Sequence, residues 1–131
     1  MALDIKIQPI KNSKISNVDF SDLPFGKVFS DHIFQCEYID GAWQNPIIKA
    51  NEPIQLNPAA KIFHYGQSIF EGMKAYKDAN GEVFLFRPED NCKRLNLSAN
   101  RLMMPEIPAD LFMQGLKKLL LNYLIDFGFD R

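Results

Sequence analysis

The strongest periodic pattern in the chain lies near its C-terminal end, where apolar residues recur at helical spacing. Residues 108–129 carry them at intervals of three and four positions, which predicts an amphipathic helix. Other apolar residues fall elsewhere on the helical wheel, so the helix should be packed on more than one side. Either this domain buries it deeply, or a partner or second domain covers the other side. The main stripe is Phe112, Leu116, Leu119, Leu120, Tyr123 and Phe127, and the others are Leu111, Met113, Leu121 and Ile125.

A second helix is predicted in residues 87–105. Pro88 suits a first helical position, and the acidic residues Glu89 and Asp90 suit the positive end of the helix dipole. Arg101 lies in the expected last turn, and Pro105 ends the helix. We expect one face of this helix to carry the apolar residues Leu95, Ala99 and Leu102.

Two hairpins are predicted before this helix. Residues 28–38 are rich in β-branched and aromatic side chains and precede Asp40-Gly41, a tight-turn sequence. Residues 42–56 then predict a second strand, a connection broken by proline and a third short strand. The second hairpin, in residues 73–86, turns at Asn80-Gly81.

The segments that remain are harder to assign. Residues 57–72 predict a short helical segment that ends at Gly72, and residues 1–24 an early strand or extended arm. Together the elements predict an α+β fold, an antiparallel sheet with two main helices at one side. A length of 131 residues fits one domain over 1–131.

Composition excludes several function classes. Lys and Arg number 15 and Asp and Glu 16, and this balance gives no electrostatic footprint for nucleic acid or an anionic membrane. No apolar run reaches the length of a membrane span, and the N-terminus lacks the apolar core of a secretory signal. The only two cysteines, Cys36 and Cys92, form no zinc motif and suit a reducing cytoplasm.

Candidate binding residues are few. Arg94 lies two turns into the 88–102 helix, where its fork could hold a phosphate or carboxylate, or could pair with Asp90 in solvent. Tyr65, beside Gly66, could approach a ligand or lie in the core with its hydroxyl satisfied. The residues form no catalytic triad, carboxylate pair, dinucleotide motif or metal cluster, so we expect no metal site and no complete active site.

The motifs over residues 63–105 add a resemblance. HYGQSIFEGMKAY, the Asn-Gly hairpin, FLFRPEDNCKRL and SANRLMMP follow one another in an order and spacing that resemble the branched-chain amino acid aminotransferases, pyridoxal-phosphate enzymes of fold type IV. PFGKVFSDHIFQCEY matches as well, and the resemblance covers about residues 20–128. A FEG tripeptide alone would mean little, but the ordered set is specific.

The resemblance implies a chemistry and a set of site residues. Such enzymes move an amino group between leucine, isoleucine or valine and 2-oxoglutarate, with pyridoxal 5′-phosphate as the electron sink. Arg94 matches the arginine that holds the cofactor phosphate, Tyr65 a tyrosine that lines the substrate pocket, and Phe25 an aromatic residue of the pocket for the branched side chain. Phe70, Glu71 and Gly72 match a signature to which we assign a structural role.

The resemblance also implies that catalysis needs more than these residues. The family's cofactor-binding lysine, and the glutamate that faces the pyridine nitrogen, lie in a larger second domain that would follow residue 131. We therefore expect this chain to be the N-terminal small domain, inactive by itself, of a cytoplasmic homodimeric enzyme. The alternatives are another fold-type IV enzyme (D-amino acid aminotransferase or aminodeoxychorismate lyase) and a non-catalytic remnant that binds a phosphorylated small molecule or a protein partner.

Overall fold

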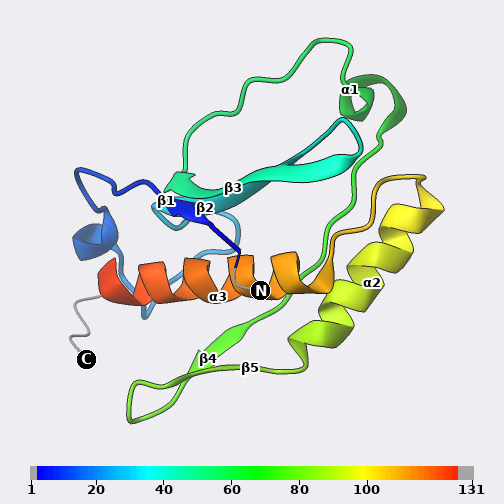
Figure 1. Ribbon diagram of the computed structural model, residues 1–131. Coiled ribbons are helices and arrows are strands. Elements are labelled where there is room, and N and C mark those ends of the chain that lie inside the picture. Colours follow the sequence, from blue (N-terminus) through cyan, green and yellow to red (C-terminus); the bar gives the residue numbers. More distant parts are fainter. Residues whose placement is uncertain (1–2, 127–131) are drawn as a thin grey trace. The chain divides into compact units, whose positions relative to one another are not determined.

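The computed structural model describes residues 3–126, which divide into two compact units (Figure 1). The first unit combines the chain up to Glu52 with the chain from Gln114 onward, and the second runs from Pro53 to Met113. Helices and small open sheets occur in separate stretches, which confirms the α+β class. The strands form two small sheets rather than one, and their antiparallel pairs are the two predicted hairpins.

The first unit is built on a three-stranded sheet in the order β1-β3-β2. Strands β2 (His32–Ile39) and β3 (Ala42–Ala50) pair antiparallel, and the short β1 (Lys6–Ile7) pairs parallel with β3. Asp40 and Gly41 join β2 to β3 with φ of 51° and 82°, the two left-handed positions of a tight primed turn. A single 3-10 turn, η1 (Ile15–Asn17), lies between β1 and β2.

Strand β3 corrects one prediction, because Pro46 does not break it. The pairing register shifts between Gln35 and Glu37, and Asn45 just before the proline has a φ of 54°. This irregularity is a β-bulge, a place where a strand tolerates a residue without an N–H group. The expected third strand is not formed either, since residues 51–59 contain no strand.

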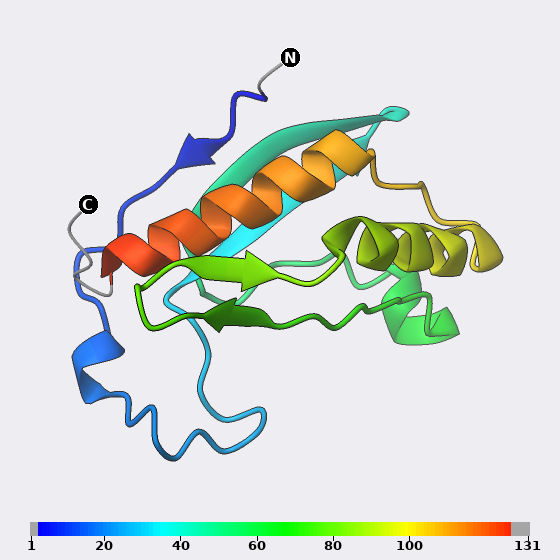
Figure 2. The same cartoon turned by 90° about the horizontal axis from the view of Figure 1, so that it is seen from below.

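Helix α3 (Ala109–Asp126) covers one face of this sheet with its residues from Gln114 onward (Figures 1 and 2). Gly115 lies directly against the ring of Phe34 on β2, and Ile48, the partner of Phe34 on β3, is fully buried. The Gln114 side chain accepts a hydrogen bond of 2.8 Å from the Leu3 backbone N–H. The core of the first unit therefore lies between α3 and the β2–β3 pair.

The predicted apolar stripe of α3 is confirmed in part. Phe112, Leu116, Leu119 and Leu120 of the stripe are half-buried, whereas Leu121, which was predicted off the stripe, is exposed. Leu111, which also lies off the stripe, is 5% exposed and is the most buried large residue among the described side chains of the helix. The side chains of Tyr123, Ile125 and Phe127 lie outside the described residues.

The second unit contains α1 (Lys61–Tyr65), β4 (Ala75–Lys77), β5 (Val83–Leu85), α2 (Pro88–Arg101) and the first turn of α3. Strands β4 and β5 form the predicted second hairpin, but with a five-residue loop at 78–82. The Asp78 carboxylate accepts hydrogen bonds of 2.9 and 2.8 Å from the N–H groups of Asn80 and Glu82. A side chain therefore organises this loop in addition to Asn80-Gly81.

Helix α2 has the predicted bounds. Pro88 is its first residue, the acidic pair follows at once, and Arg101 is its last. Its buried residues are Cys92 and Ala99, with Leu95 half-buried between them. Leu102 lies just beyond the helix and is 39% exposed, so it does not continue the buried face as expected.

The helix predicted to reach Gly72 ends much earlier. Helix α1 stops at Tyr65, and Gly66 follows it in the left-handed region with a φ of 58°. A residue in this conformation terminates a helix, and glycine adopts it without steric cost. Residues 66–74 then run without helix or strand.

Candidate functional site

Arg94 on α2 binds Glu71 across a gap of 23 positions in the chain. The guanidinium donates from Nε to Oε2 of Glu71 at 3.0 Å and from Nη2 to Oε1 of the same carboxylate. This two-point pairing is the strongest geometry open to an arginine and a carboxylate. The Glu71 side chain is 12% exposed and that of Arg94 65%, so the acid is enclosed while the base faces solvent.

The electrostatics of the pair follow from these hydrogen bonds. The Arg94 guanidinium, helped by the Asn91 amide and the Gly72 N–H, lowers the pKa of Glu71 from 4.5 to about 2, against a desolvation effect that raises it. The hydrogen bond from Arg94 to Glu71 in turn raises the pKa of Arg94. Both groups are therefore charged at neutral pH.

Asn91 completes the cluster from the preceding turn of α2. Its Nδ2 donates to Oε1 of Glu71 and to the Gly72 carbonyl, each at 3.1 Å. At the other end of the irregular segment, Gln67 Nε2 donates a hydrogen bond of 2.9 Å to the carbonyl of Leu102, the residue just after α2. Residues 67–72 are thus tied to α2 near both of its ends.

The predicted alternative, a solvated Arg94 paired with Asp90, is not what forms. Asp90 makes ion pairs with Arg87 and Lys93 on its own stretch of chain. Arg94 lies on the same side of α2 as Asn91, since both side chains reach Glu71.

Tyr65 is exposed rather than packed in the core. Tyr65 is the last residue of α1 and is 81% exposed. The neighbouring His64 forms a hydrogen bond with the Pro58 carbonyl. The core alternative for Tyr65 is therefore wrong within the described residues. Tyr65 and Arg94 belong to the same compact unit, but no hydrogen bond between described residues joins them.

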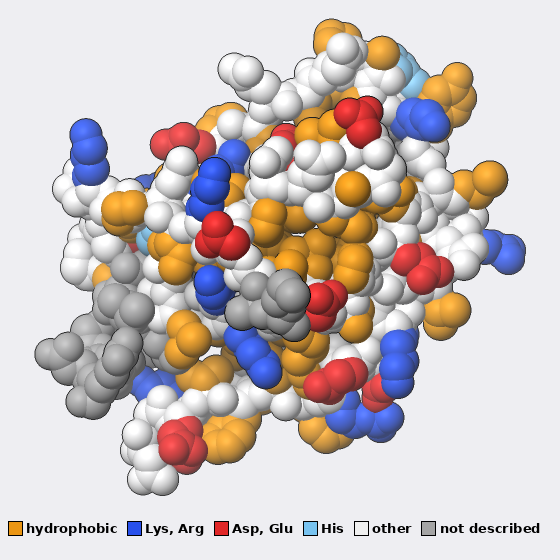
Figure 3. All heavy atoms as spheres, viewed as in Figure 1, with side chains coloured by type: hydrophobic (Ala, Val, Ile, Leu, Met, Phe, Trp, Pro, Cys, Tyr) orange, Lys and Arg blue, Asp and Glu red, His pale blue; other side chains and the backbone are white. Residues whose placement is uncertain are grey.

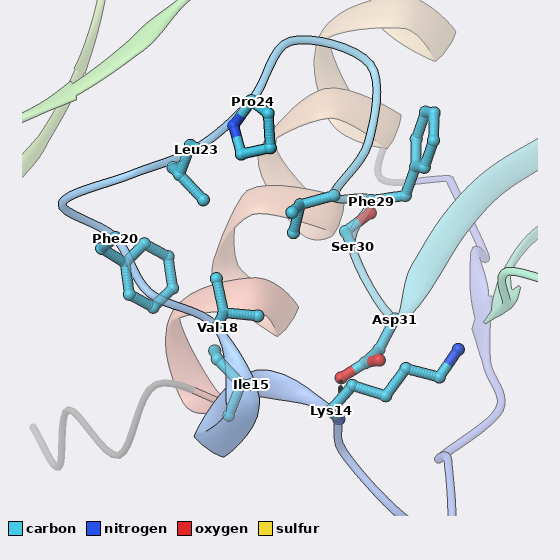
Figure 4. Close-up of a pocket in the computed structure, with 10 residues that line it drawn as sticks. Lys14, Ile15, Val18, Phe20, Leu23, Pro24, Phe29, Ser30 and Asp31 are labelled. Atoms are coloured by element: carbon cyan, nitrogen blue, oxygen red, sulfur yellow. Dashed lines mark hydrogen bonds between the residues drawn. The ribbon is translucent and has the colours of Figure 1, made fainter.

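Phe25 belongs to the first unit and is fully exposed. It lies in a loop whose neighbouring residues line a small pocket of about 120 Å³ (Figure 4). At one end of this pocket, Asp31 Oδ2 accepts hydrogen bonds from the Lys14 N–H at 3.0 Å and the Ser13 hydroxyl at 2.6 Å. The apolar part of the lining includes Ile15, Val18, Phe20, Leu23, Pro24 and Phe29.

Large apolar side chains are exposed in both units. Figure 3 shows hydrophobic side chains gathered between charged ones on the face drawn there. In the second unit the most exposed are Phe70 at 92% and Met103 at 91%. Each of these two side chains is accessible to other protein or a ligand.

Two further features bear on the class of site. The described residues contain no group of three or more His, Cys, Asp or Glu side chains placed to hold a metal ion. None of the helices, as far as they are described, has the length and apolar character needed to cross a membrane.

The chain is similar to enzymes of one named group. It is 43% identical to branched-chain-amino-acid aminotransferase 2 of Bacillus subtilis (strain 168), over 84% of this chain and 31% of the relative. This chain is related to the branched-chain-amino-acid aminotransferases. It is also 46% identical to the Mycolicibacterium smegmatis enzyme of that name, over 73% of this chain and 26% of the relative.

A further relative is a probable branched-chain-amino-acid aminotransferase of Staphylococcus aureus (strain N315), 50% identical over 76% of this chain and 28% of the relative. The chain thus spans only about a third of the length of these aminotransferases and corresponds to a fragment of one. No protein-family model matches it.

The sequence interpretation of the site missed its central contact. Glu71 was assigned only a structural role, and Asn91 no role. Polar and apolar residues do not alternate in the sequence of residues 67–73, so no local signal marks the contact. In the structure, however, Gln67, Ile69, Glu71 and Met73 are less exposed than the residues between them. An extended chain alternates its side chains in this way, and alternation places Glu71 on the inner side.

Proposed function

We propose that this chain is the N-terminal small domain of an aminotransferase that moves the amino group of a branched-chain amino acid to 2-oxoglutarate. The observation that carries the proposal is the relation to enzymes of that name at 43–50% identity. The geometry of Arg94 supports it, because an exposed guanidinium held by a carboxylate keeps its outer edge available for an anion.

Arg94 fits the phosphate group of pyridoxal 5′-phosphate. The guanidinium has five N–H donors, and Glu71 accepts from two of them, so three donors remain on a side chain that is 65% exposed. A phosphate presents matching oxygen pairs to a guanidinium edge. When bound, the cofactor would supply the electron sink for amino transfer, and this chain would hold its anionic end.

Tyr65 and Phe25 are our candidates for substrate contacts. Both are aromatic and highly exposed, at 81% and 104%, so each is free to line a pocket that other parts of the enzyme complete. Apolar contacts of this kind distinguish substrates by roughly 1–3 kcal/mol per methylene, which suits a preference for branched side chains.

Catalysis by this domain would need a second, larger domain that carries the cofactor-binding lysine, and a second copy of the subunit. The exposed apolar side chains support contacts of this extent. The thiols of Cys36 and Cys92 are free, which suits the cytoplasmic location that we propose. Light scattering of the native-length protein at high concentration should give the mass of a dimer, and a clean monomer would contradict the dimer.

The function is tested by substrate choice. Native-length protein saturated with pyridoxal 5′-phosphate should transfer the amino group of L-leucine to 2-oxoglutarate and leave D-alanine unused. Activity on D-alanine alone would identify a D-amino acid aminotransferase instead. The isolated 131-residue chain should be inactive on both, and measurable leucine turnover by it would refute the need for a second domain.

A further inference from the structure

We infer that Glu71 is a positioning residue for Arg94: its enclosed carboxylate fixes one edge of the guanidinium so that the opposite edge is aimed at a phosphate. This inference rests on the proposed function, because it assumes that Arg94 binds a phosphate ester. It goes beyond that function in giving a task to an acid that does not itself touch the ligand.

Glu71 holds one edge of the Arg94 guanidinium and leaves the others open. Nε and Nη2 share one edge of the planar guanidinium, and both donate to Glu71. The remaining donors, both N–H groups of Nη1 and the second of Nη2, point away from Glu71 in the guanidinium plane. A second two-point contact, to a phosphate, is therefore open while the first is made.

Glu71 is itself held by groups other than Arg94. Its side chain is 12% exposed and accepts from Asn91 Nδ2 at 3.1 Å and from the Gly72 N–H at 3.0 Å, in addition to Arg94. Asn91 also binds the Gly72 carbonyl, so it clamps both the side chain and the backbone of this segment. The carboxylate is thus held by two contacts besides the one with Arg94.

Without Glu71, the Arg94 side chain would have to be ordered when it binds a phosphate. An arginine side chain that is 65% exposed would lose rotamer freedom on binding an anion. Since Glu71 already restrains the guanidinium, that ordering does not have to occur at the moment of binding. The negative charge of Glu71 acts the other way, because it weakens the attraction of Arg94 for a phosphate. If orientation dominates, removing the carboxylate should weaken phosphate binding by Arg94. If charge dominates, it should strengthen that binding.

The experiment measures how strongly the native-length apo-protein prefers pyridoxal 5′-phosphate to pyridoxal, by absorbance titration with each. The two probes differ only in the phosphate, so the affinity ratio reports phosphate recognition without any need for turnover. Glu71→Gln keeps the size of the side chain and removes its charge, and we expect the ratio to fall about tenfold. Glu71→Asp keeps the charge but withdraws the carboxylate, and the ratio should fall there too.

Asp90→Asn is the matched control. Asp90 also acts on Arg94 by its charge but makes no hydrogen bond to it. If charge alone mattered, Asp90→Asn and Glu71→Gln would both raise the ratio, and Glu71→Asp would leave it unchanged, which would overturn the inference. An unchanged ratio in Glu71→Gln would mean that Glu71 only ties the chain together.

Two further results keep the test decisive. If Glu71→Gln fails to fold, Asn91→Ala removes the clamp on Glu71 and should lower the ratio about threefold, whereas an unchanged ratio would count against the inference. If the wild-type protein shows no preference for the phosphorylated probe, the proposed function fails. If Arg94→Ala abolishes the preference and the Glu71 variants do not, only the positioning role fails.

Discussion

Glu71 and Arg94 form a two-point ion pair in which the acid is enclosed and the base is exposed. The pairing lowers the pKa of Glu71 to about 2. A carboxyl with a lowered pKa in the folded state contributes stability above its unfolded pKa, near 4.5, and that contribution is lost as the pH falls toward 2. We therefore expect the stability difference between wild type and Glu71→Gln to be constant above about pH 5 and to shrink between pH 4.5 and 2.

Carboxyl NMR titration of Glu71 checks this directly. Wild type should titrate near pH 2, and Arg94→Ala should move the pKa back toward 4.5, because the Arg94 hydrogen bond is its largest cause. A pKa of Glu71 near 4.5 in the wild-type protein would show that the pair does not form in solution.

The second prediction compares two substitutions of Arg94, one that removes its charge and one that keeps it. Arg94→Ala should weaken binding of pyridoxal 5′-phosphate by about 10- to 100-fold, the range for a lost charge-assisted hydrogen-bond pair. Arg94→Lys keeps the charge but has no planar fork to serve Glu71 and a phosphate together, so it should recover only part of the loss. Fluorescence titration measures both, and Lys93→Ala, one position away and paired with Asp90, is the control that should bind normally.

Elements that depend on local chemistry could be predicted from the sequence, but the partner of Arg94 could not. The hairpin at Asp40-Gly41 and the helix from Pro88 to Arg101 were predicted because each depends on local chemistry, a left-handed turn and a proline start. The partner of Arg94 was not, because Glu71 lies 23 positions away and only the course of residues 66–74 brings it close. Helical spacing favoured Asp90 as the partner of Arg94, but Asp90 forms its ion pairs with Arg87 and Lys93.

Two errors in the fold have the same origin. The spacing of apolar and polar residues continued a helix to Gly72, but the left-handed backbone at Gly66 ended it at Tyr65. Pro46 was expected to break a strand, but pairing with β2 carried the chain past it in a bulge. In both cases the backbone conformation of one residue outweighed the pattern of its neighbours.

The third prediction concerns Gly66 and Gly72, which both lie in the irregular segment of residues 66–74. A Cβ would meet open space at both Gly66 and Gly72, but only Gly66 has a positive φ. Gly66→Ala should therefore lower the free energy of unfolding by about 1–2 kcal/mol through backbone strain. Gly72→Ala should be neutral or add a few tenths of a kcal/mol by restricting the unfolded chain. Urea denaturation of both variants provides the comparison, and equal effects would exclude φ as the cause.

The last prediction concerns Gly115 in the middle of α3. Alanine in a helix interior is normally up to about 1 kcal/mol better than glycine. Here a Cβ at position 115 would lie 2.7 Å from Cζ of Phe34, which no real contact allows. Because the ring must shift, Gly115→Ala should lower the free energy of unfolding by about 1–3 kcal/mol despite the better helix propensity.

Making Gly115→Ala in a Phe34→Leu variant separates the effect of helix propensity from that of the clash with the Phe34 ring. With the ring removed, the same Gly115→Ala change should become neutral or stabilising by up to about 1 kcal/mol, since only the helix propensity remains. A double-mutant cycle in urea measures the sign. If Gly115→Ala destabilises the protein equally in both backgrounds, α3 does not rest on β2 through this contact, and the packing of the first unit would have to be different.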